Sequence, residues 1–120
     1  MINTFKHNLG LYFSTVAEQS GSRDALRFFG GERATYTQLE SVSNQIAHFL
    51  VDRGCLCGDV VAILHDKSMM GYAIMLACLK LGVTYTNLDA GSPDERLRKM
   101  LSLADPRVCF VGTTFRQEIA

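Results

Sequence analysis

The chain has 120 residues, of which 48% are hydrophobic and 20% are charged. This composition excludes an intrinsically disordered protein, and the length suffices for one domain with a buried core. Twelve basic residues balance twelve acidic ones, so the net charge does not favour a nucleic acid or a membrane as a partner.

The apolar runs and the cysteines bear on the location of the chain. The N-terminal residues lack the uninterrupted apolar stretch of a secretory signal. The longest apolar run, Met69–Leu79, is shorter than the roughly 20 residues that span a bilayer. The four cysteines are expected to be reduced thiols in such a chain. We therefore predict a cytoplasmic protein.

The first part of the chain predicts a helix followed by a β-hairpin. Apolar residues recur at helical spacing over residues 5–17, and Gly21 ends this helix. Two β-prone runs, residues 25–29 and 32–36, flank Gly30-Gly31, which suits the positive φ of a tight turn.

A second helix is predicted directly after the hairpin. Thr37 and Glu40 form the T-x-x-E pattern of a capping box, in which each side chain satisfies a free amide of the first turn. Apolar residues follow on one face from Leu39 to Leu50, and Gly54 supplies the stop.

The second half of the chain alternates strands and helices. The predicted elements are a strand over 60–64, a helix over 68–81, a strand over 83–88, a helix beginning at Ser92, and a strand over 108–111. This order predicts an α/β fold with two βαβ units, right-handed crossovers and a mainly parallel sheet flanked by helices. Residues 1–120 then form a single folded unit.

The boundaries of the last helix rest on local signals. Ser92 is predicted to cap it, Pro93 fits the first helical position, and Glu95 completes a second capping box. Asp105-Pro106 ends the helix. Its apolar face lies opposite a basic face formed by Arg96, Arg98 and Lys99.

The residues alone give no reaction type. The chain contains neither a G-x-x-x-x-G-K-[ST] loop nor a G-x-G-x-x-G loop, and Gly30-Gly31 is better explained as a turn than as a phosphate cradle. His65-Asp66 follows the first parallel strand, where catalytic residues can lie, but a solvated loop pair is favoured. A solvated surface is likewise favoured for the basic face, and core filling for Met69, Met70 and Met75.

The cysteines leave a metal or redox protein as one alternative. Cys55 and Cys57 form a C-x-C pair, and Cys78 and Cys109 lie elsewhere. Structural zinc sites usually combine two C-x₂₋₄-C pairs, and the second pair is missing, so the favoured interpretation is small hydrophobic residues in the core and no metal site.

Three segments in order resemble the opening of adenylate-forming (AMP-binding) enzymes, which include acyl- and aryl-CoA synthetases, luciferases and nonribosomal peptide synthetase adenylation domains. Residues 34–39 are similar to the family's L-[TS]-Y-x-E-L motif, with Gln38 in place of Glu. Residues 58–63 are similar to G-D-x-V-A-[VI], and residues 79–89 to L-K-A-G-x-x-Y-[LV]-P-[LI]-D. Residues 91–97 continue like the family's P-x-x-R-[LI] helix.

Two departures and one preference accompany the resemblance. Asn87 and Ala90 stand where the family usually has proline, which relaxes that turn. The L-D ending and the continuation over residues 92–97 are more similar to amino-acid-activating members than to fatty acyl ones.

The resemblance implies an ATP- and magnesium-dependent ligase that forms an acyl- or aminoacyl-adenylate and then a thioester. The family's phosphate loop, acidic magnesium motif, ribose-binding aspartate and catalytic lysine have no counterpart in these 120 residues. No catalytic or cofactor-binding residue is therefore assigned, and no cofactor is expected on this chain alone. By position, only Leu88, Asp89 and Ala90 correspond to a loop that lies near the thiol acceptor in some CoA-using relatives.

Two functions stay open at this stage. The chain is either the N-terminal part of such a ligase, inactive by itself, or a non-catalytic interaction module that self-associates or complements a partner fragment. The expected partners are the rest of an adenylation domain or a second copy, without nucleic acid or membrane. The sequence does not select the carboxylate, nor CoA over a carrier protein as the acceptor.

Overall fold

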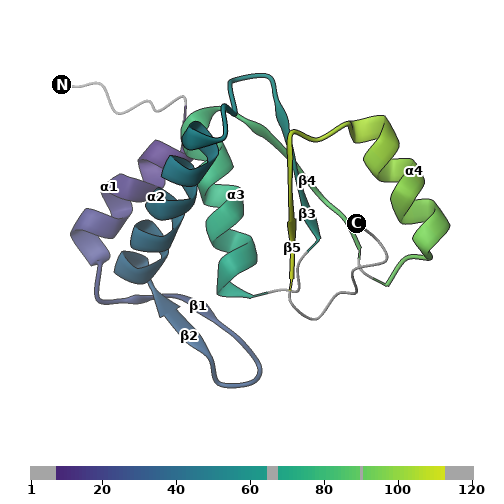
Figure 1. The fold of residues 1–120 in the computed structure, drawn as a ribbon. Helices are drawn as coiled ribbons and strands as arrows, with labels where there is room; N and C mark the ends of the chain where they lie inside the picture. The colour runs from purple at the N-terminus through teal and green to yellow at the C-terminus, as the bar shows by residue number, and fades with distance from the viewer. Residues whose placement is uncertain (1–7, 65–67, 90, 113–120) are drawn as a thin grey trace.

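The computed structural model describes residues 8–64, 68–89 and 91–112. Its elements appear in chain order in Figure 1. They are α1 (Leu9–Ser20), β1 (Asp24–Arg27), β2 (Arg33–Thr35), α2 (Tyr36–Asp52), β3 (Val60–Leu64), α3 (Met69–Leu81), β4 (Thr84–Asn87), α4 (Asp94–Ala104) and β5 (Val108–Val111). The order confirms the predicted α/β fold with an N-terminal helix and hairpin. None of the described helices is long and apolar enough to cross a bilayer.

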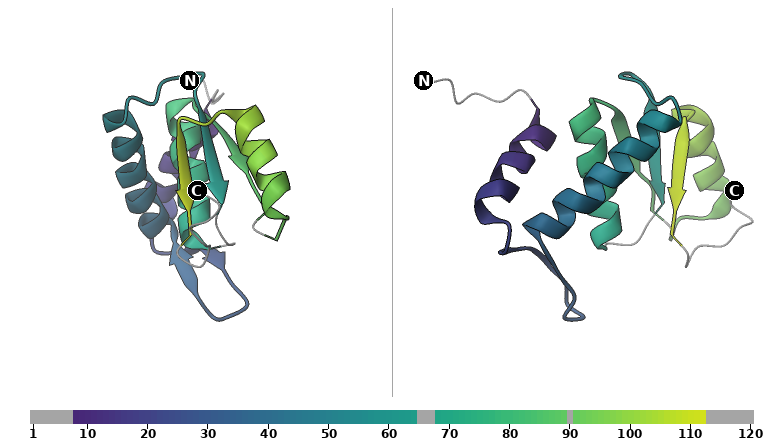
Figure 2. Two further views of the ribbon diagram at one scale, coloured as in Figure 1. Left: turned by 45° about the vertical axis from the view of Figure 1, so that its right-hand side comes forward. Right: turned by 60° about the vertical axis from the view of Figure 1, so that its left-hand side comes forward.

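A three-stranded parallel sheet lies between two layers of helices. The strand order is β4-β3-β5, so the β4–α4–β5 connection passes over the central strand. The helices α1, α2 and α3 lie on one side of the sheet and α4 lies on the other (Figures 1 and 2). Both predicted βαβ units are therefore present.

The central strand β3 separates two apolar cores. Successive side chains of a strand point to opposite faces. Val61 and Ile63 join the core formed with α2 and α3, whereas Ala62 and Leu64 join a smaller core under α4. All four are at most 1% exposed. Burial on both faces explains why this strand reads as a continuous apolar run.

The start of α2 differs from the sequence prediction. Its capping box consists of Thr35 and Gln38, not Thr37 and Glu40: the Thr35 hydroxyl accepts from the Gln38 amide, and the Gln38 side chain accepts from the Thr35 amide. Thr35 is also the last residue of β2 and pairs with Asp24. The strand pairing therefore fixes the helix start two residues earlier. Gly54, with a φ of 77°, follows the helix end as predicted.

The other helix ends give one more correction. Ser68 precedes α3, and Gly82 ends it in the left-handed conformation, as expected. At α4, by contrast, Pro93 is the N-cap and no side chain caps the first turn. The Ser92 amide instead donates to the Asp89 carbonyl, which makes Ser92 part of the preceding turn. The predicted capping box of Ser92 and Glu95 is therefore wrong.

The N-terminal helix and the hairpin follow the prediction with shorter bounds. Asn8 caps α1 by accepting from the Leu11 amide, so the helix begins at Leu9; residue 5 lies outside the described residues. The two short strands pair antiparallel around a turn in which Gly31 has a φ of 92°. Only glycine adopts this conformation without strain.

Candidate functional site

The carboxyl ends of the three parallel strands meet at one edge of the sheet, the usual place for ligands in such folds. Two backbone hydrogen bonds fix the register of the strand ends there. The Leu88 amide donates to the Ile63 carbonyl at 2.8 Å, and the Gly112 amide donates to the Leu64 carbonyl at 3.0 Å. The carboxyl ends of the three strands therefore lie side by side. We take this edge as the candidate functional site.

The loop after β4 supplies the described residues of this site. Leu88 is 8% exposed and belongs to the core under α4, so it anchors the loop. Asp89 is exposed, and its Oδ1 accepts from the Gly91 amide at 2.9 Å, which closes a tight turn. Ala90 lies outside the described residues. The loop thus presents one carboxylate at the site edge, already engaged by its own backbone.

Among the described residues, the other sequence candidates do not come together as one constellation. His65 and Asp66 lie outside the described residues. Gly30 and Gly31 form the hairpin turn. The basic side chains of α4 are exposed on the helix surface: Arg96, Arg98 and Lys99. Of the three methionines, Met69 and Met75 pack against the larger core, whereas Met70 is 42% exposed.

The cysteines are separated by burial. Cys55 and Cys78 are buried in the larger core, as predicted, whereas the prediction of a core position is wrong for Cys57 and Cys109, which are exposed; all four are free thiols. Burial, with a smaller contribution from Cys55, raises the pKa of Cys78 to about 12, and burial also raises the pKa of Cys55. Among the described residues, no three His, Cys, Asp or Glu side chains come together as metal ligands.

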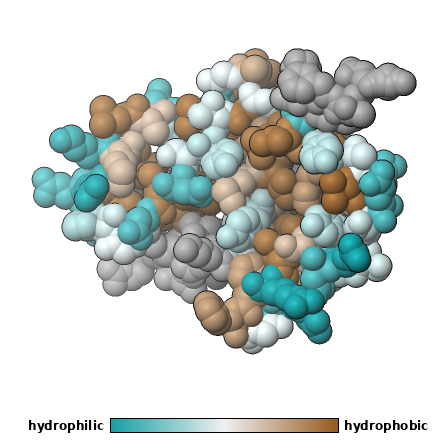
Figure 3. Space-filling model, turned by 180° about the vertical axis from the view of Figure 1, so that it is seen from behind, coloured by the Kyte–Doolittle hydropathy of each residue, from teal (hydrophilic) through white to brown (hydrophobic). Residues whose placement is uncertain are grey.

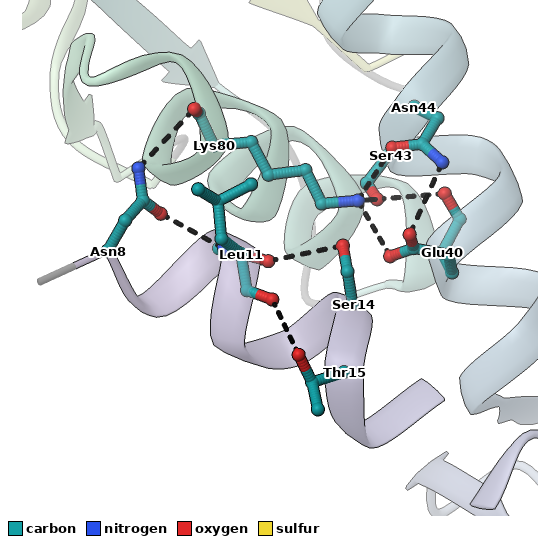
Figure 4. A network of polar contacts seen from close by, with 9 residues as sticks. Asn8, Leu11, Ser14, Thr15, Glu40, Ser43, Asn44 and Lys80 are labelled. Carbon is teal, nitrogen blue, oxygen red and sulfur yellow. Dashed lines mark hydrogen bonds and ion pairs between the residues drawn. The ribbon is translucent and has the colours of Figure 1, made fainter. Parts of the chain in front are cut away.

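A polar junction that the sequence analysis missed joins α1, α2 and α3. The Lys80 side chain is only 7% exposed, and its Nζ lies 2.7 Å from Glu40 Oε1, 2.9 Å from Ser43 Oγ and 2.7 Å from Asn44 Oδ1 (Figure 4). On the other side, the Asn8 side chain donates to the Lys80 carbonyl. We call these residues, with Lys80 at the centre, the Lys80 junction. Lys80 is the lysine of the L-K-x-G motif, so this part of the motif serves packing.

Electrostatics explain why a lysine is tolerated in this apolar helix. All three donor positions of an ammonium group find an acceptor, which offsets much of the cost of removing the charge from water. Burial acts to raise the pKa of Glu40, but hydrogen bonds and the charge of Lys80 outweigh it and hold this pKa below its ordinary value. The junction is therefore an ion pair at neutral pH.

An open groove lies beside the β1–β2 hairpin, next to the end of α1. It has a volume of about 690 Å³ and is lined by Ser20, Ser22, Arg23, Asp24, Ala25, Arg27 and Tyr36. The Asp24 carboxylate in it is paired with Arg27 at 3.1 Å and Arg33 at 3.4 Å. The one carboxylate of the groove is thus already paired within the hairpin, and the groove offers no enclosed site.

Known proteins share both this sequence and this fold. The chain matches the model of the AMP-binding enzyme family over residues 13–120. It is 34% identical over 87 residues to surfactin synthase subunit 2 of Bacillus subtilis (strain 168), a match that covers 72% of this chain and 2% of that protein. It is 34% identical over 97 residues to malpinin synthetase of Mortierella alpina, a match that covers 80% of this chain and 1% of that protein.

Solved structures give the same class. The Klebsiella oxytoca NpsA N-terminal subdomain has a TM-score of 0.79 at 26% identity, covering 91% of this chain and 28% of that chain. A luciferase-like enzyme from Zophobas morio has a TM-score of 0.82 at 24% identity, covering 95% of this chain and 28% of that chain, a likeness of fold alone.

These matches define an N-terminal fragment of the adenylate-forming superfamily. The chain belongs to the AMP-binding enzyme family. It spans at most 2% of the two synthetases and 28% of each of the two solved chains.

Proposed function

We propose that this chain is the N-terminal scaffold of an ATP-dependent ligase that activates a carboxylate as an acyl- or aminoacyl-adenylate and passes it to a thiol. One observation carries the proposal: the family match extends over residues 13–120 and includes the motif series in the family's order. In the parent reaction, the carboxylate displaces pyrophosphate from ATP, and the thiol then displaces AMP. ATP and magnesium belong to that larger enzyme.

The described residues do not by themselves fit ATP and magnesium. The sheet edge offers Asp89 as its described carboxylate, and its Oδ1 is engaged by the Gly91 amide. No described cluster of acidic residues, histidines or cysteines could hold the metal. We therefore assign no catalytic step to this chain alone, because the groups that would stabilise the transferring phosphate are not among its residues.

The experiment that tests this proposal is ATP–pyrophosphate exchange with the purified chain and a panel of amino, aromatic and fatty acids. We expect no exchange above the rate without protein. Exchange that depends on one carboxylate would refute the assignment of the chemistry to residues outside this chain.

Exposed apolar side chains support a partner that completes the domain. They are distributed over the hairpin, four helices, the loop before β3 and the last strand, and Figure 3 shows apolar side chains across the middle of the rear face. The exposed large side chains are Leu9, Leu11, Tyr12, Phe29, Phe49, Val51, Leu56, Met70, Leu103 and Val111. Where apolar side chains gather, as on this rear face, they are typical of an interface. The partner we propose is the remainder of an adenylation domain.

The second candidate is a non-catalytic module that self-associates, and the same surface favours it. Light scattering distinguishes the two candidates, because a monomer at tens of micromolar, roughly the range of weak contacts, would exclude the self-associating module. Within either proposal, residues 1–120 act as a single unit in the cytoplasm.

We also propose that the loop of Leu88, Asp89 and Ala90 lies near the thiol acceptor in the completed enzyme. Its support is its position after β4 at the carboxyl edge of the sheet. In a completed enzyme, Asp89→Ala should slow thioester formation more than pyrophosphate exchange. Equal effects on both steps would remove the loop from the acceptor site.

A further inference from the structure

The groove beside the β1–β2 hairpin is lined mainly by hydrogen-bond donors. Three hydroxyl groups and two guanidinium groups face it, together with one carboxylate. The polar lining residues are Ser20, Ser22, Arg23, Asp24, Arg27 and Tyr36. A guanidinium group has five N–H donors and no acceptor. The described lining therefore offers a ligand many more donors than acceptors.

Backbone hydrogen bonds fix the frame of this groove between α1 and α2. The Arg23 amide donates to the Ser20 carbonyl, and the Tyr36 amide donates to the Arg23 carbonyl, both at 3.0 Å. The Thr37 amide donates to the Gly21 carbonyl at 3.0 Å, and a Cβ at Gly21 would collide with the Thr37 hydroxyl. The close approach of these two segments holds the lining residues in place without help from their side chains.

Two arginines of the hairpin share one carboxylate. Arg27 and Arg33 lie directly opposite each other across β1 and β2, where like charges destabilise a strand pair. A single oxygen, Asp24 Oδ2, lies 3.1 Å from Arg27 Nε and 3.4 Å from Arg33 Nη1. The two arginine side chains are 75% and 63% exposed, and exposed ion pairs contribute only about 0–1 kcal/mol. Both guanidinium groups therefore keep most of their donors for a ligand.

Arg23 adds a third positive charge to the groove. Its side chain is exposed, and it forms no ion pair with another described residue. Glu32, the second carboxylate of the hairpin, lies at the turn and is not part of the groove lining. The whole chain has no net charge, so this excess of positive charge is a local feature. Such a surface is complementary to an anionic partner.

We propose that the groove binds an acidic segment of another polypeptide, whose carboxylates pair with Arg23 and Arg27. Charge complementarity selects this ligand, because guanidinium and carboxylate groups form charge-assisted hydrogen bonds. The groove is open and has a volume of about 690 Å³, which suits an extended peptide, whereas small molecules usually occupy enclosed pockets. The Ser22 and Tyr36 hydroxyls are available to the peptide backbone. This binding goes beyond the ligase function and uses no residue of the loop after β4.

Fluorescence anisotropy of the complete chain tests the proposal. The probe is a fluorescein-labelled peptide of alternating Glu and Ser, and the neutral comparison is a peptide of alternating Gln and Ser. The groove variant carries Arg23→Gln and Arg27→Gln. The matched control, Arg96→Gln with Lys99→Gln, removes two exposed positive charges from α4. A third variant, Arg23→Gln alone, keeps both ion pairs of Asp24, and circular dichroism verifies that every variant folds.

We expect saturable binding of the acidic peptide to the wild-type chain and to the α4 control, and none of the neutral peptide. The groove variant should bind the acidic peptide at least about tenfold more weakly, and Arg23→Gln alone about threefold more weakly. Raising the NaCl concentration from about 20 to about 500 mM should also weaken binding at least about tenfold, because salt screens exposed charges.

Four results would overturn the proposal. The wild-type chain could fail to bind the acidic peptide, or it could bind the neutral peptide equally well. The α4 control could lose as much affinity as the groove variant, which would indicate general attraction between opposite charges. Displacement of the peptide by inorganic phosphate at about 1 mM would identify a phosphate site in place of a site for acidic polypeptides.

Discussion

Replacing Lys80 with methionine tests the energetic role of the Lys80 junction. The substitution keeps an unbranched side chain in the apolar helix α3 and removes the ammonium group. Glu40, Ser43 and Asn44 then each lose the donor that lies 2.7 to 2.9 Å away. Ser43 is fully buried, and the Glu40 side chain is 24% exposed.

The expected cost follows from burial. Breaking a buried ion pair by removing one partner costs about 3–5 kcal/mol, and an unsatisfied buried acceptor costs about 1–3 kcal/mol. Glu40 retains some contact with water, which lowers the penalty for its unpaired charge. We therefore expect Lys80→Met to reduce the free energy of unfolding by about 3 kcal/mol, a large part of the roughly 5–15 kcal/mol of a typical domain.

Urea denaturation followed by circular dichroism measures this loss. The midpoint should fall by about 1–2 M with an unchanged slope. Lys99→Met is the matched control, because Lys99 is exposed on α4, and its effect should stay within about 0.5 kcal/mol. A loss below about 0.5 kcal/mol for Lys80→Met would show that the junction contributes nothing net, and the reasoning from burial would be refuted.

Three further predictions concern charge, capping and thiol reactivity. Because the pKa of Glu40 in the folded chain lies below its ordinary value of 4.5, the ionised carboxylate stabilises the fold at pH values above 4.5. The difference in free energy of unfolding between wild type and Glu40→Gln should therefore shrink as the pH falls below 4.5. A difference that stays constant during acid denaturation would contradict this. Thr35→Ala should lower the free energy of unfolding by about 1 kcal/mol, and Ser92→Ala should lower it by less than about half of that. If thermal melts show a larger loss for Ser92→Ala, then Ser92 does cap α4 as the sequence predicted. Iodoacetamide at about pH 8 should alkylate exposed Cys57 and leave Cys78, with a pKa of about 12, unmodified until urea is added; native labelling of Cys78 by mass spectrometry would disprove its burial.

The parallel sheet was predictable because its signals are local and agree with one another. The apolar run of β3 has the same bounds, Val60–Leu64, in sequence and structure. The helix α3 ends at Gly82, which adopts a φ of 71°. Glycine takes this left-handed conformation readily, so the residue type alone indicated the end of the helix. A strand buried on both faces gives a continuous apolar run, and a helix end often carries a glycine. Both patterns can be recognised in the sequence without knowledge of distant contacts.

The helix starts were harder because two residues competed for the same role. Thr35 and Thr37 both have a Gln or Glu three positions later, so both fit a capping box. The structure selects Thr35, since the Tyr36 amide donates to the Arg23 carbonyl and the chain turns from strand to helix there. This choice depends on the pairing of the hairpin, which a local motif does not contain.

The Lys80 junction could be found only by combining two helices. Its acceptors lie at positions 40, 43 and 44 of α2, a spacing that brings them to one helix face. The single lysine in the otherwise apolar helix α3 was the available signal, but the sequence does not state which residues of α2 pack against it. The candidate site was less predictable still, because the loop after β4 contributes one described carboxylate.

Equilibrium dialysis of the isolated chain against ATP and Mg²⁺ is the most direct test of the view that it supplies scaffold without the phosphate-binding groups. The account predicts no saturable binding up to about 1 mM ATP. Saturable binding of one nucleotide per chain with a dissociation constant of about 10 μM or below would contradict it.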